Sequence, residues 1–316
     1  MNTPCTHLEG KNVLVTGGTR GLGLMQVDEA LRCGANHVTF TSRPKEKGGN
    51  EADAENAKNF LKENYDEERF TYVESDVRQI CPENEGNLVD DGACNGRVFD
   101  PEIRKSLGVP ERLDSISLNA GVFGPGDETR RLDKLSMEHF DNTIRTNCTG
   151  VFHGIRDFAN ALQRQEVQPS NPSVVVLKSI YGSGASLFGS AGYMGSKFCA
   201  NGVTKQAAIE YARPERGYPR IQINSVSPAF SKTTMTRGFW DEEKVRDEVA
   251  NAHPTGTWVE GSSVAKTVTW LMNPPQNVTG ADIPVDNAVM AQSVPGWSQA
   301  DRIRKITGEP CCGSTE

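Results

Sequence analysis

The chain has 316 residues, of which 36% are hydrophobic and 24% charged, and its formal net charge at pH 7 is −7. This length suits one large α/β domain. The acidic balance argues against a nucleic-acid surface and against a basic membrane patch. The first ten residues hold no apolar signal-peptide stretch and no window suits a membrane span, so we expect a cytoplasmic protein.

Short β-rich runs alternate with longer amphipathic runs along the chain. The runs that predict strands are 12–16, 37–42, 70–75, 113–118, 173–179, 220–227 and 280–285. The runs that predict helices are 22–34, 54–65, 135–165 and 193–213. This alternation predicts an α/β doubly wound parallel sheet, the Rossmann fold, in three α/β/α layers. We expect a single domain over residues 1–293.

Eight cysteines allow a disulfide framework as one interpretation. Cys33, Cys148 and Cys199, however, fall inside apolar helical patterns, where a free cysteine packs as a small core residue. Cys81 and Cys94 lie in a predicted loop, and neither stands near a histidine at the spacing of a metal site. We therefore expect reduced thiols and no bound metal.

Residues 14–24, LVTGGTRGLGL, place four glycines between the first predicted strand and the first predicted helix. A glycine turn at this junction lets the backbone approach a pyrophosphate at the helix N-terminus. The spacing Thr16-Gly17-x-x-x-Gly21-x-Gly23 differs from the commonest dinucleotide fingerprint. Taken alone, it leaves a cofactor site and a simple turn equally open.

The end of the second predicted strand bears on the choice of nucleotide. NAD-selective enzymes usually carry an acid about twenty residues after the glycine turn, where it holds the ribose hydroxyls. Here Ser42 is followed by Arg43 in place of an acid, and Arg20 lies inside the glycine turn. Two guanidinium groups favour the 2′-phosphate of NADP(H). The alternative is that both arginines are solvated surface residues.

Tyr193 and Lys197 are four residues apart, so on a helix both side chains face the same side. A cation there, together with an oxidised nicotinamide, favours the phenolate and lowers the pKa of Tyr193 toward neutrality. Tyr193 then becomes a general acid for a carbonyl oxygen or a base for an alcohol. Such pairs also occur on ordinary helices, but Ser179 at a strand end and Asn147 at a helix start strengthen the catalytic interpretation.

The ordered set of motifs resembles the short-chain dehydrogenase/reductase family over about residues 8–293. The motifs are TGGTRGLG, Asp76-Val77, LNAG (118–121), Asn147, Ser179, Tyr193 with Lys197, and SPAFSKTTM (227–235). Each motif alone is weak evidence for the family, whereas the presence of all of them in this order is specific to it. The resemblance implies an NADPH-dependent oxidoreductase that transfers a hydride between the nicotinamide and a ketone or secondary alcohol.

The resemblance also implies a role for each catalytic residue. Tyr193 exchanges the proton, and Lys197 holds the ribose and tunes Tyr193. Ser179 hydrogen-bonds the substrate oxygen, and Asn147 anchors a water relay through Lys197.

A longer set of residues is implied for the cofactor, with Thr233 at the nicotinamide carboxamide. The expected cofactor-binding residues are Gly17, Thr19, Arg20, Gly21, Leu22, Gly23, Ser42, Arg43, Asp76, Val77, Asn119, Ala120, Gly121, Tyr193, Lys197, Pro228 and Thr233.

Four positions depart from the family pattern. Ser179 stands fourteen residues before Tyr193, one more than usual, so the loop between them must bulge. Lys178 replaces a small residue, Ala229 replaces a glycine, and 285–288 (VDNA) replaces a diglycine ending. None of the four removes a catalytic group, so they concern the shape of the pocket more than the reaction.

Two segments are additions to the family pattern. Residues 78–112 are longer than the usual helical connection, and because their first part is acidic and rich in Gly and Asn, we expect a surface loop there. Residues 294–316 form a C-terminal tail without a core pattern.

Aromatic residues near the expected site indicate a bulky apolar ketone, such as a natural-product intermediate of secondary metabolism. The expected substrate residues are Tyr181, Phe188, Phe230, Phe239 and Trp240, with Val122 and Phe123 beside them. The alternative is that these aromatics pack a lid or a subunit contact.

Assembly and function leave further alternatives. Small and apolar residues along helices 150–165 and 197–212, together with the resemblance, imply a homodimer or homotetramer. The pocket could instead serve imine reduction, isomerisation or cyclisation, or the protein could be a non-catalytic NADP sensor. A retired site has no chemical reason to keep all four catalytic residues, which counts against the sensor.

Overall fold

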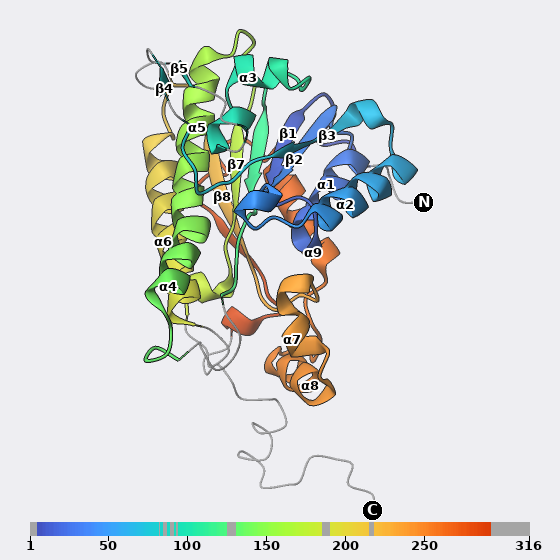
Figure 1. Cartoon of the computed structure of the whole chain (residues 1–316), viewed down its shortest axis with the longest axis vertical. Coiled ribbons are helices and arrows are strands. Elements are labelled where there is room, and N and C mark those ends of the chain that lie inside the picture. Colours follow the sequence, from blue (N-terminus) through green and yellow to red (C-terminus); the bar gives the residue numbers. More distant parts are fainter. Residues whose placement is uncertain are drawn as a thin grey trace, which may run out of the picture.

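A computed structural model describes residues 5–81, 83–84, 87–88, 92, 94–124, 131–184, 190–214 and 218–291. Seven strands form one parallel sheet in the order β3-β2-β1-β6-β7-β8-β9 (Figure 1). Their bounds are β1 Asn12–Thr16, β2 His37–Ser42, β3 Phe70–Glu74, β6 Ser115–Leu118, β7 Ser173–Leu177, β8 Gln222–Pro228 and β9 Asp282–Val285. The predicted doubly wound parallel sheet is confirmed.

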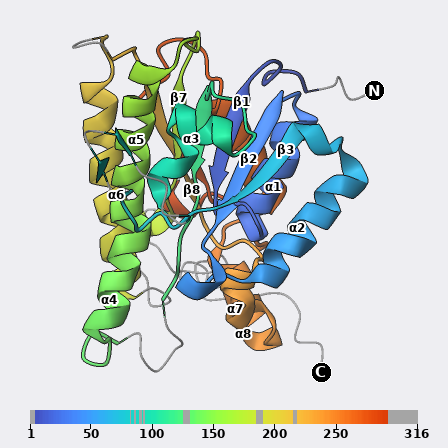
Figure 2. The ribbon, with the colours of Figure 1, turned by 45° about the horizontal axis from the view of Figure 1, so that its top comes forward.

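Helices cover both faces of this sheet (Figures 1 and 2). On one face lie α4 Met137–Ile144, α5 Gly150–Arg164 and α6 Ala191–Glu210. On the other lie α1 Gly21–Arg32, α2 Glu51–Asn64 and α9 Gly261–Leu271. Short α7 Arg237–Trp240 and α8 Glu243–Ala252 lie together below the sheet in Figure 1. Within the described ranges, no helix has the length and apolar content needed to cross a bilayer.

The central strands are apolar because helices bury them on both sides. Every residue of β1, β7 and β8 is buried, as expected for strands in a doubly covered parallel sheet. Side chains that alternate along these strands pack into two separate hydrophobic cores, one on each face of the sheet. Val13 and Val15 pack beneath α1 and α9, and Leu14 packs on the side of α5 and α6.

The predicted helix over 135–165 is divided in the structure. A π-helical turn, η5 (Arg145–Thr149), joins α4 to α5. π turns of this kind occur often at functional sites. Here the turn carries Asn147, so the irregularity lies next to the predicted catalytic residues.

The segment 78–112 contains regular structure as well as loop. Two short strands, β4 Glu83–Asn84 and β5 Asn87–Leu88, pair antiparallel. They are followed by η3 Asn95–Val98 and α3 Pro101–Ser106. Val98 and Phe99 are buried in the core on the α5 side, so the second half of this segment belongs to the packed domain.

The expectation of reduced thiols is wrong for six cysteines. The structure joins them in three disulfides with Cα–Cα distances of 4.4, 4.8 and 5.7 Å, namely Cys5–Cys33, Cys81–Cys94 and Cys148–Cys199. His7 lies beside Cys5 and Cys33 in a group with metal-ligand chemistry, but the bonded sulfurs offer no thiolate. Disulfides are rare in the reducing cytosol, so these pairs do not support the predicted cytoplasmic location. That location stays a prediction.

Candidate active site

A cavity of about 270 Å³ opens at the carboxyl ends of the central strands. It is lined by the segments that follow β1, β2, β6, β7 and β8. The order of the sheet reverses between β1 and β6. In open parallel sheets, ligands bind at the carboxyl ends of the strands at such a switch point.

Glycine is required in the turn between β1 and α1. Gly17 and Gly21 have φ angles of 67° and 53°, a conformation that other residues rarely adopt. A Cβ on Gly17 would stand 2.9 Å from the Cα of Ala120, and one on Gly23 would collide with the carbonyl oxygen of Gly17. Glycine therefore allows the turn to pack closely against the end of β6, and Gly17, Gly21 and Gly23 line the cavity at the start of α1.

Asn119 locks this turn to the end of β6. Its side-chain amide donates to the carbonyl oxygens of Thr16 at 2.9 Å and Gly17 at 3.1 Å. Its amide oxygen accepts from Gln26 at 3.0 Å. Both amide protons are thus used by the protein, and Asn119 acts on the cavity mainly by fixing the shape of the glycine turn.

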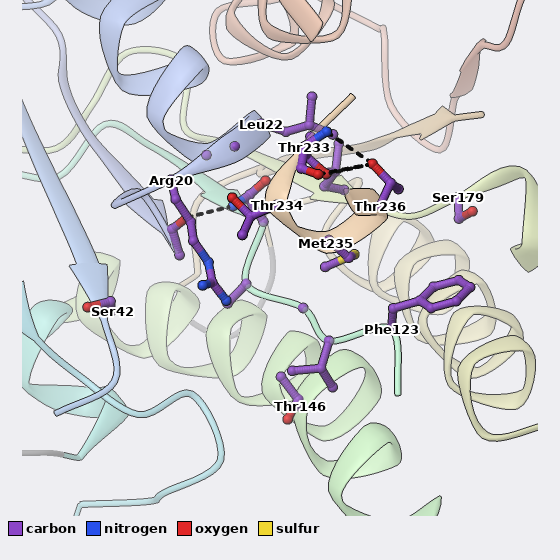
Figure 3. A pocket seen from close by; sticks show the side chains of 18 of the residues that line it. Arg20, Leu22, Ser42, Phe123, Thr146, Ser179, Thr233, Thr234, Met235 and Thr236 are labelled. Atoms are coloured by element: carbon purple, nitrogen blue, oxygen red, sulfur yellow. Dashed lines mark hydrogen bonds between the residues drawn. The ribbon is translucent and has the colours of Figure 1, made fainter. Parts of the chain in front are cut away.

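Two arginines, Arg20 and Arg43, line the cavity, and Arg20 lies on the opposite side from Ser179 (Figure 3). Arg20 forms an ion pair with Asp53 of α2 at 3.0 Å. Arg43 is partly buried, and burial followed by the nearby Arg78 lowers its pKa below the usual arginine value. Because Asp53 balances Arg20, Arg43 supplies much of the net positive charge here.

Asp76 and Val77, both predicted to bind the cofactor, differ in their position relative to the cavity. Val77 lines the cavity, whereas Asp76 does not and is only 1% exposed. The carboxylate of Asp76 accepts from Arg78 Nη2 at 2.6 Å and Nε at 2.9 Å. All other predicted cofactor-binding residues line the cavity, namely Gly17, Thr19, Arg20, Gly21, Leu22, Gly23, Ser42, Arg43, Asn119, Ala120, Gly121, Tyr193, Lys197, Pro228 and Thr233.

Three of the four predicted catalytic residues meet in the cavity: Ser179, Tyr193 and Lys197. Ser179 follows β7, and its hydroxyl accepts from the backbone N–H of Tyr181 at 3.2 Å and hydrogen-bonds the phenol of Tyr193. Lys197 lies one turn after Tyr193 on α6, with Nζ 5.6 Å from the phenol ring centroid. This ammonium donates to the carbonyl oxygen of Leu177 at 3.0 Å.

Asn147 lies behind the cavity and does not line it. Its side chain accepts from the N–H of Val122 at 2.9 Å and donates to the Val122 carbonyl at 2.8 Å and to Ser196 at 3.0 Å. It therefore ties the segment after β6 to α6. Both the oxygen and the nitrogen of this amide are thus already engaged by the protein.

Burial dominates the protonation of the tyrosine–lysine pair. It raises the pKa of Tyr193 to about 12, against a lowering effect of the hydrogen bond from Ser179. It lowers the pKa of Lys197 to about 8, with a further lowering by the charge of Lys178. For the protein's own groups, desolvation thus outweighs the hydrogen bond from Ser179, and the lowered pKa expected for Tyr193 beside an oxidised nicotinamide stays a prediction.

Aromatic rings form one wall beside Tyr193. The ring of Phe123 lies 4.7 Å from that of Tyr193, and the ring of Tyr181 lies 6.2 Å from it. Phe230 contacts Tyr181 at 6.0 Å and Phe239 at 5.4 Å between ring centroids. Tyr181, Phe230 and Phe123 line the cavity, so the wall next to the Tyr193 ring is largely aromatic.

The other predicted substrate residues are not part of this wall. Phe239 is packed behind Phe123 and Phe230 and does not line the cavity. Trp240 also stays outside the lining, and its indole N–H donates to the carbonyl oxygen of Thr233 at 3.1 Å. Phe188 lies outside the described residues.

A family profile described as "Enoyl-(Acyl carrier protein) reductase" matches residues 102–289, more than half of the chain. The chain belongs to the short-chain dehydrogenase/reductase family. Cyclohexanol dehydrogenase of Acinetobacter sp. (strain SE19) is 31% identical over 171 residues, which are 54% of this chain and 61% of that enzyme. The match therefore spans less than two thirds of that relative.

Two further relatives match this short-chain dehydrogenase/reductase over nearly their full length. The 3-oxoacyl-(acyl-carrier-protein) reductase of Rickettsia conorii is 27% identical over 90% of this chain and 98% of that enzyme. The structure of ElxO with NADP bound has a TM-score of 0.68 and 27% identity, over 89% of this chain and 99% of that one.

Several cavity residues of this family member were missed from the sequence. They are Gly48, Gly49, Asn50 and Asp53 near the start of α2, and Thr146, Ile180, Thr234, Met235 and Thr236 elsewhere. The predicted helix began at 54, three residues after the true start of α2. Asn50 caps that helix by accepting from the N–H of Ala52 at 3.1 Å, a signal that an N-cap search would have found.

The segment after β8 covers one side of the cavity. Figure 3 shows Thr233–Thr236 across from Thr146, with Arg20 on one side and Ser179 and Phe123 on the other. The N–H of Thr233 donates to the Thr236 hydroxyl at 3.0 Å. This hydrogen bond closes a compact turn over the middle of the cavity.

Two of the four departures from the family pattern have visible consequences. The altered ending at 285–288 places Asn287 and Ala288 at φ angles of 52° and 67°. These are left-handed conformations that the usual diglycine adopts without strain. Lys178 is buried beside Ser179. The predicted bulge lies between Ser179 and Tyr193, and residues 185–189 of this loop are outside the described residues.

Proposed function

We propose that the protein is an NADPH-dependent oxidoreductase that interconverts a bulky apolar ketone and its secondary alcohol. One observation carries this proposal. Ser179, Tyr193 and Lys197 share a cavity with the glycine turn and with Arg43. One cavity thus holds both the candidate proton donor and the residues that would bind a nucleotide.

The residues of the cavity fit a phosphorylated dinucleotide. Gly17, Gly21 and Gly23 of the glycine turn line the cavity at the N-terminus of α1, which is where a pyrophosphate is stabilised. Arg43 and Arg20 would hold the 2′-phosphate, and the likeness to ElxO with NADP bound supports this choice. When bound, NADPH supplies the hydride, and the protein supplies the proton.

Proton delivery follows from the three catalytic side chains. Ser179 would donate a hydrogen bond to the substrate carbonyl oxygen and hold it beside the hydroxyl of Tyr193. Tyr193 would then give its proton to that oxygen, which becomes the alcohol hydroxyl. Lys197, fixed by the Leu177 carbonyl, would stabilise the resulting phenolate.

The aromatic wall supports an apolar substrate. Phe123, Tyr181 and Phe230 line the cavity close to Tyr193, and burying an apolar ring against them excludes water from the reacting carbonyl. The names of two relatives, a cyclohexanol dehydrogenase and a 3-oxoacyl reductase, also indicate alcohol and ketone chemistry.

An oligomer is part of the proposal. Phe152 of α5 and Phe198 and Ile209 of α6 are 49%, 49% and 72% exposed. Large apolar side chains gathered on adjacent helices favour pairing with a second copy. Light scattering should report a dimer or tetramer, and a monomer at working concentration would contradict this part.

The decisive experiment supplies NADPH and a panel of cyclic, aromatic and small aliphatic ketones to the purified protein. Loss of NADPH absorbance with bulky apolar ketones, and little with small polar ones, is the expected result. NADPH binding without turnover of any ketone or imine would favour a sensor. Substrate conversion without net NADPH oxidation would favour an isomerase or cyclase.

A further inference from the structure

Lys178 is a charged residue buried directly beside the catalytic centre. Its side chain is 1% exposed, and Nζ lies 2.9 Å from a carboxylate oxygen of Asp282. The same ammonium donates to the amide oxygen of Asn201 at 2.7 Å. A buried ammonium is costly unless it is paired, and here two partners from separate elements satisfy it.

Asp282 is itself a fixed partner. It stands at the start of β9 and accepts from the hydroxyls of Ser225 and Ser227, each at 2.9 Å. Both serines belong to β8. The carboxylate is therefore held in place by the sheet, so the position of the Lys178 ammonium is set by three neighbouring strands.

The same residues reach the catalytic lysine. Asn201 lies one helical turn after Lys197 on α6. Leu177, the last residue of β7 and the neighbour of Lys178, accepts the hydrogen bond from Lys197 at 3.0 Å. Three successive residues at the end of β7 thus contribute a carbonyl, an ammonium and the Ser179 hydroxyl to one small region.

We propose that Lys178 is a positioning residue that, with Asp282 and Asn201, aligns β7 with α6 and holds a buried positive charge that acts on Lys197. This inference rests on the proposed function of Lys197. The family has a small residue at position 178, so the device belongs to this chain. It acts through Lys197 and does not need to touch the substrate.

The charges around Lys178 give the direction in which the pKa of Lys197 should change. Within the described structure, the charged groups that interact with Lys178 are Lys197 and Lys205 of α6 and Asp282 of β9. The positive charge of Lys178 lowers the pKa of Lys197. Removing that charge should therefore raise the pKa of Lys197, and removing the negative charge of Asp282 as well should lower it again.

The first test reads Lys197 without any turnover. Lysines labelled with ¹³C at Cε are titrated by NMR, and the Lys197 signal is identified by its absence in Lys197→Met. The wild type should titrate at about 8. Lys178→Met should move this midpoint upward by about half a unit or more, and Lys178→Arg should leave it nearly unchanged.

A double variant guards against misfolding. Lys178→Met/Asp282→Asn removes both charges and leaves no unpaired carboxylate, so its Lys197 midpoint should lie between those of Lys178→Met and the wild type. An unchanged midpoint in both Lys178→Met and the double variant would overturn the proposal. A midpoint that shifts equally in Lys178→Arg would also overturn it, because a structural disturbance alone would then suffice.

A second test uses the reaction and separates this inference from the proposed function. Alcohol oxidation should fall at high pH as Lys197 loses its proton, and this limb should move upward in Lys178→Met. If no ketone or alcohol reacts, the proposed function fails while the NMR shift still stands. If the wild type converts substrate, but Lys178→Met moves neither the high-pH limb nor the NMR midpoint of Lys197, the proposed role of Lys178 is wrong and the proposed function still stands.

Discussion

The ammonium of Lys197 lies 5.6 Å from the ring centroid of Tyr193 and is held there by the carbonyl oxygen of Leu177. The backbone of β7, rather than the phenol, fixes the position of this cation. Its effect on Tyr193 is therefore electrostatic and acts through a region from which water is largely removed. Because both groups are buried, small changes of charge here should produce large changes in protonation.

Removal of the Tyr193 hydroxyl tests the proton donor. Tyr193→Phe deletes one oxygen and keeps the ring contact with Phe123, so the fold and NADPH affinity should persist. Turnover should drop by about 10²–10⁴-fold, the usual contribution of general acid–base catalysis. Steady-state kinetics and NADPH titration measure the two properties separately. A wild-type rate in Tyr193→Phe would place the proton donor elsewhere.

Lys197→Met should shift the pH dependence of alcohol oxidation upward. Burial already raises the pKa of Tyr193 to about 12, and the phenolate needed as base is favoured by a nearby cation. Without that cation, the phenolate forms only at higher pH, so the rising limb of the rate profile moves to higher pH. Lys244→Met, at an exposed position, is the matched control and should leave the profile unchanged.

Arg43→Asp should reverse the preference between NADPH and NADH. The new carboxylate repels a 2′-phosphate and can accept from the ribose hydroxyls of NADH. Arg20→Ala should weaken NADPH binding less, because Arg20 is balanced by Asp53 at 3.0 Å. Fluorescence titration of both nucleotides measures these affinities. Equal affinity of the wild type for NADPH and NADH would contradict the role of Arg43.

The sequence predicted the sheet well, and for a physical reason. Strands such as 12–16 and 173–177 are buried on both faces, so their sequences are largely apolar runs between turns. The four residues Asn147, Ser179, Tyr193 and Lys197 occur in motifs with fixed spacing. Their elements follow from local pattern, although three of them face the cavity and Asn147 lies behind it.

What the sequence did not reveal depends on contacts between distant elements. Lys178 was visible only as a departure from a pattern, because its pairing with Asp282 requires the register of β8 and β9. Asp53 was missed because the first turn of α2 is polar and carries no apolar periodicity. The cysteine pairs are likewise set by tertiary packing rather than by spacing along the chain.

The disulfides predict a low count of free thiols. Six of the eight cysteines are paired, so the unfolded chain should react with no more than about two equivalents of a thiol reagent before reduction. After reduction it should react with all eight. Peptide mapping without reductant should recover Cys148 joined to Cys199. Eight reactive thiols in the freshly purified chain would show that the pairs are reduced in the cell.

The turn after β9 offers a test by stability. Ala288 is exposed and has a φ of 67°, a left-handed conformation that costs a non-glycine residue about 1–2 kcal/mol. Its N–H donates to Asp286 at 3.0 Å, so the surrounding turn holds it in place. Ala288→Gly relieves this strain and loses only a methyl group, although glycine also gains freedom in the unfolded chain.

The free energy of unfolding should therefore rise by about 0.5–1 kcal/mol in Ala288→Gly, measured by denaturant titration. Asn287→Gly should gain less, because asparagine tolerates this conformation and its amide donates to the carbonyl oxygen of Thr257 at 2.8 Å. Ala52→Gly, at an exposed position in α2, is the matched control and should lower stability by about 0.5 kcal/mol. Equal losses in Ala288→Gly and Ala52→Gly would show that position 288 is not strained.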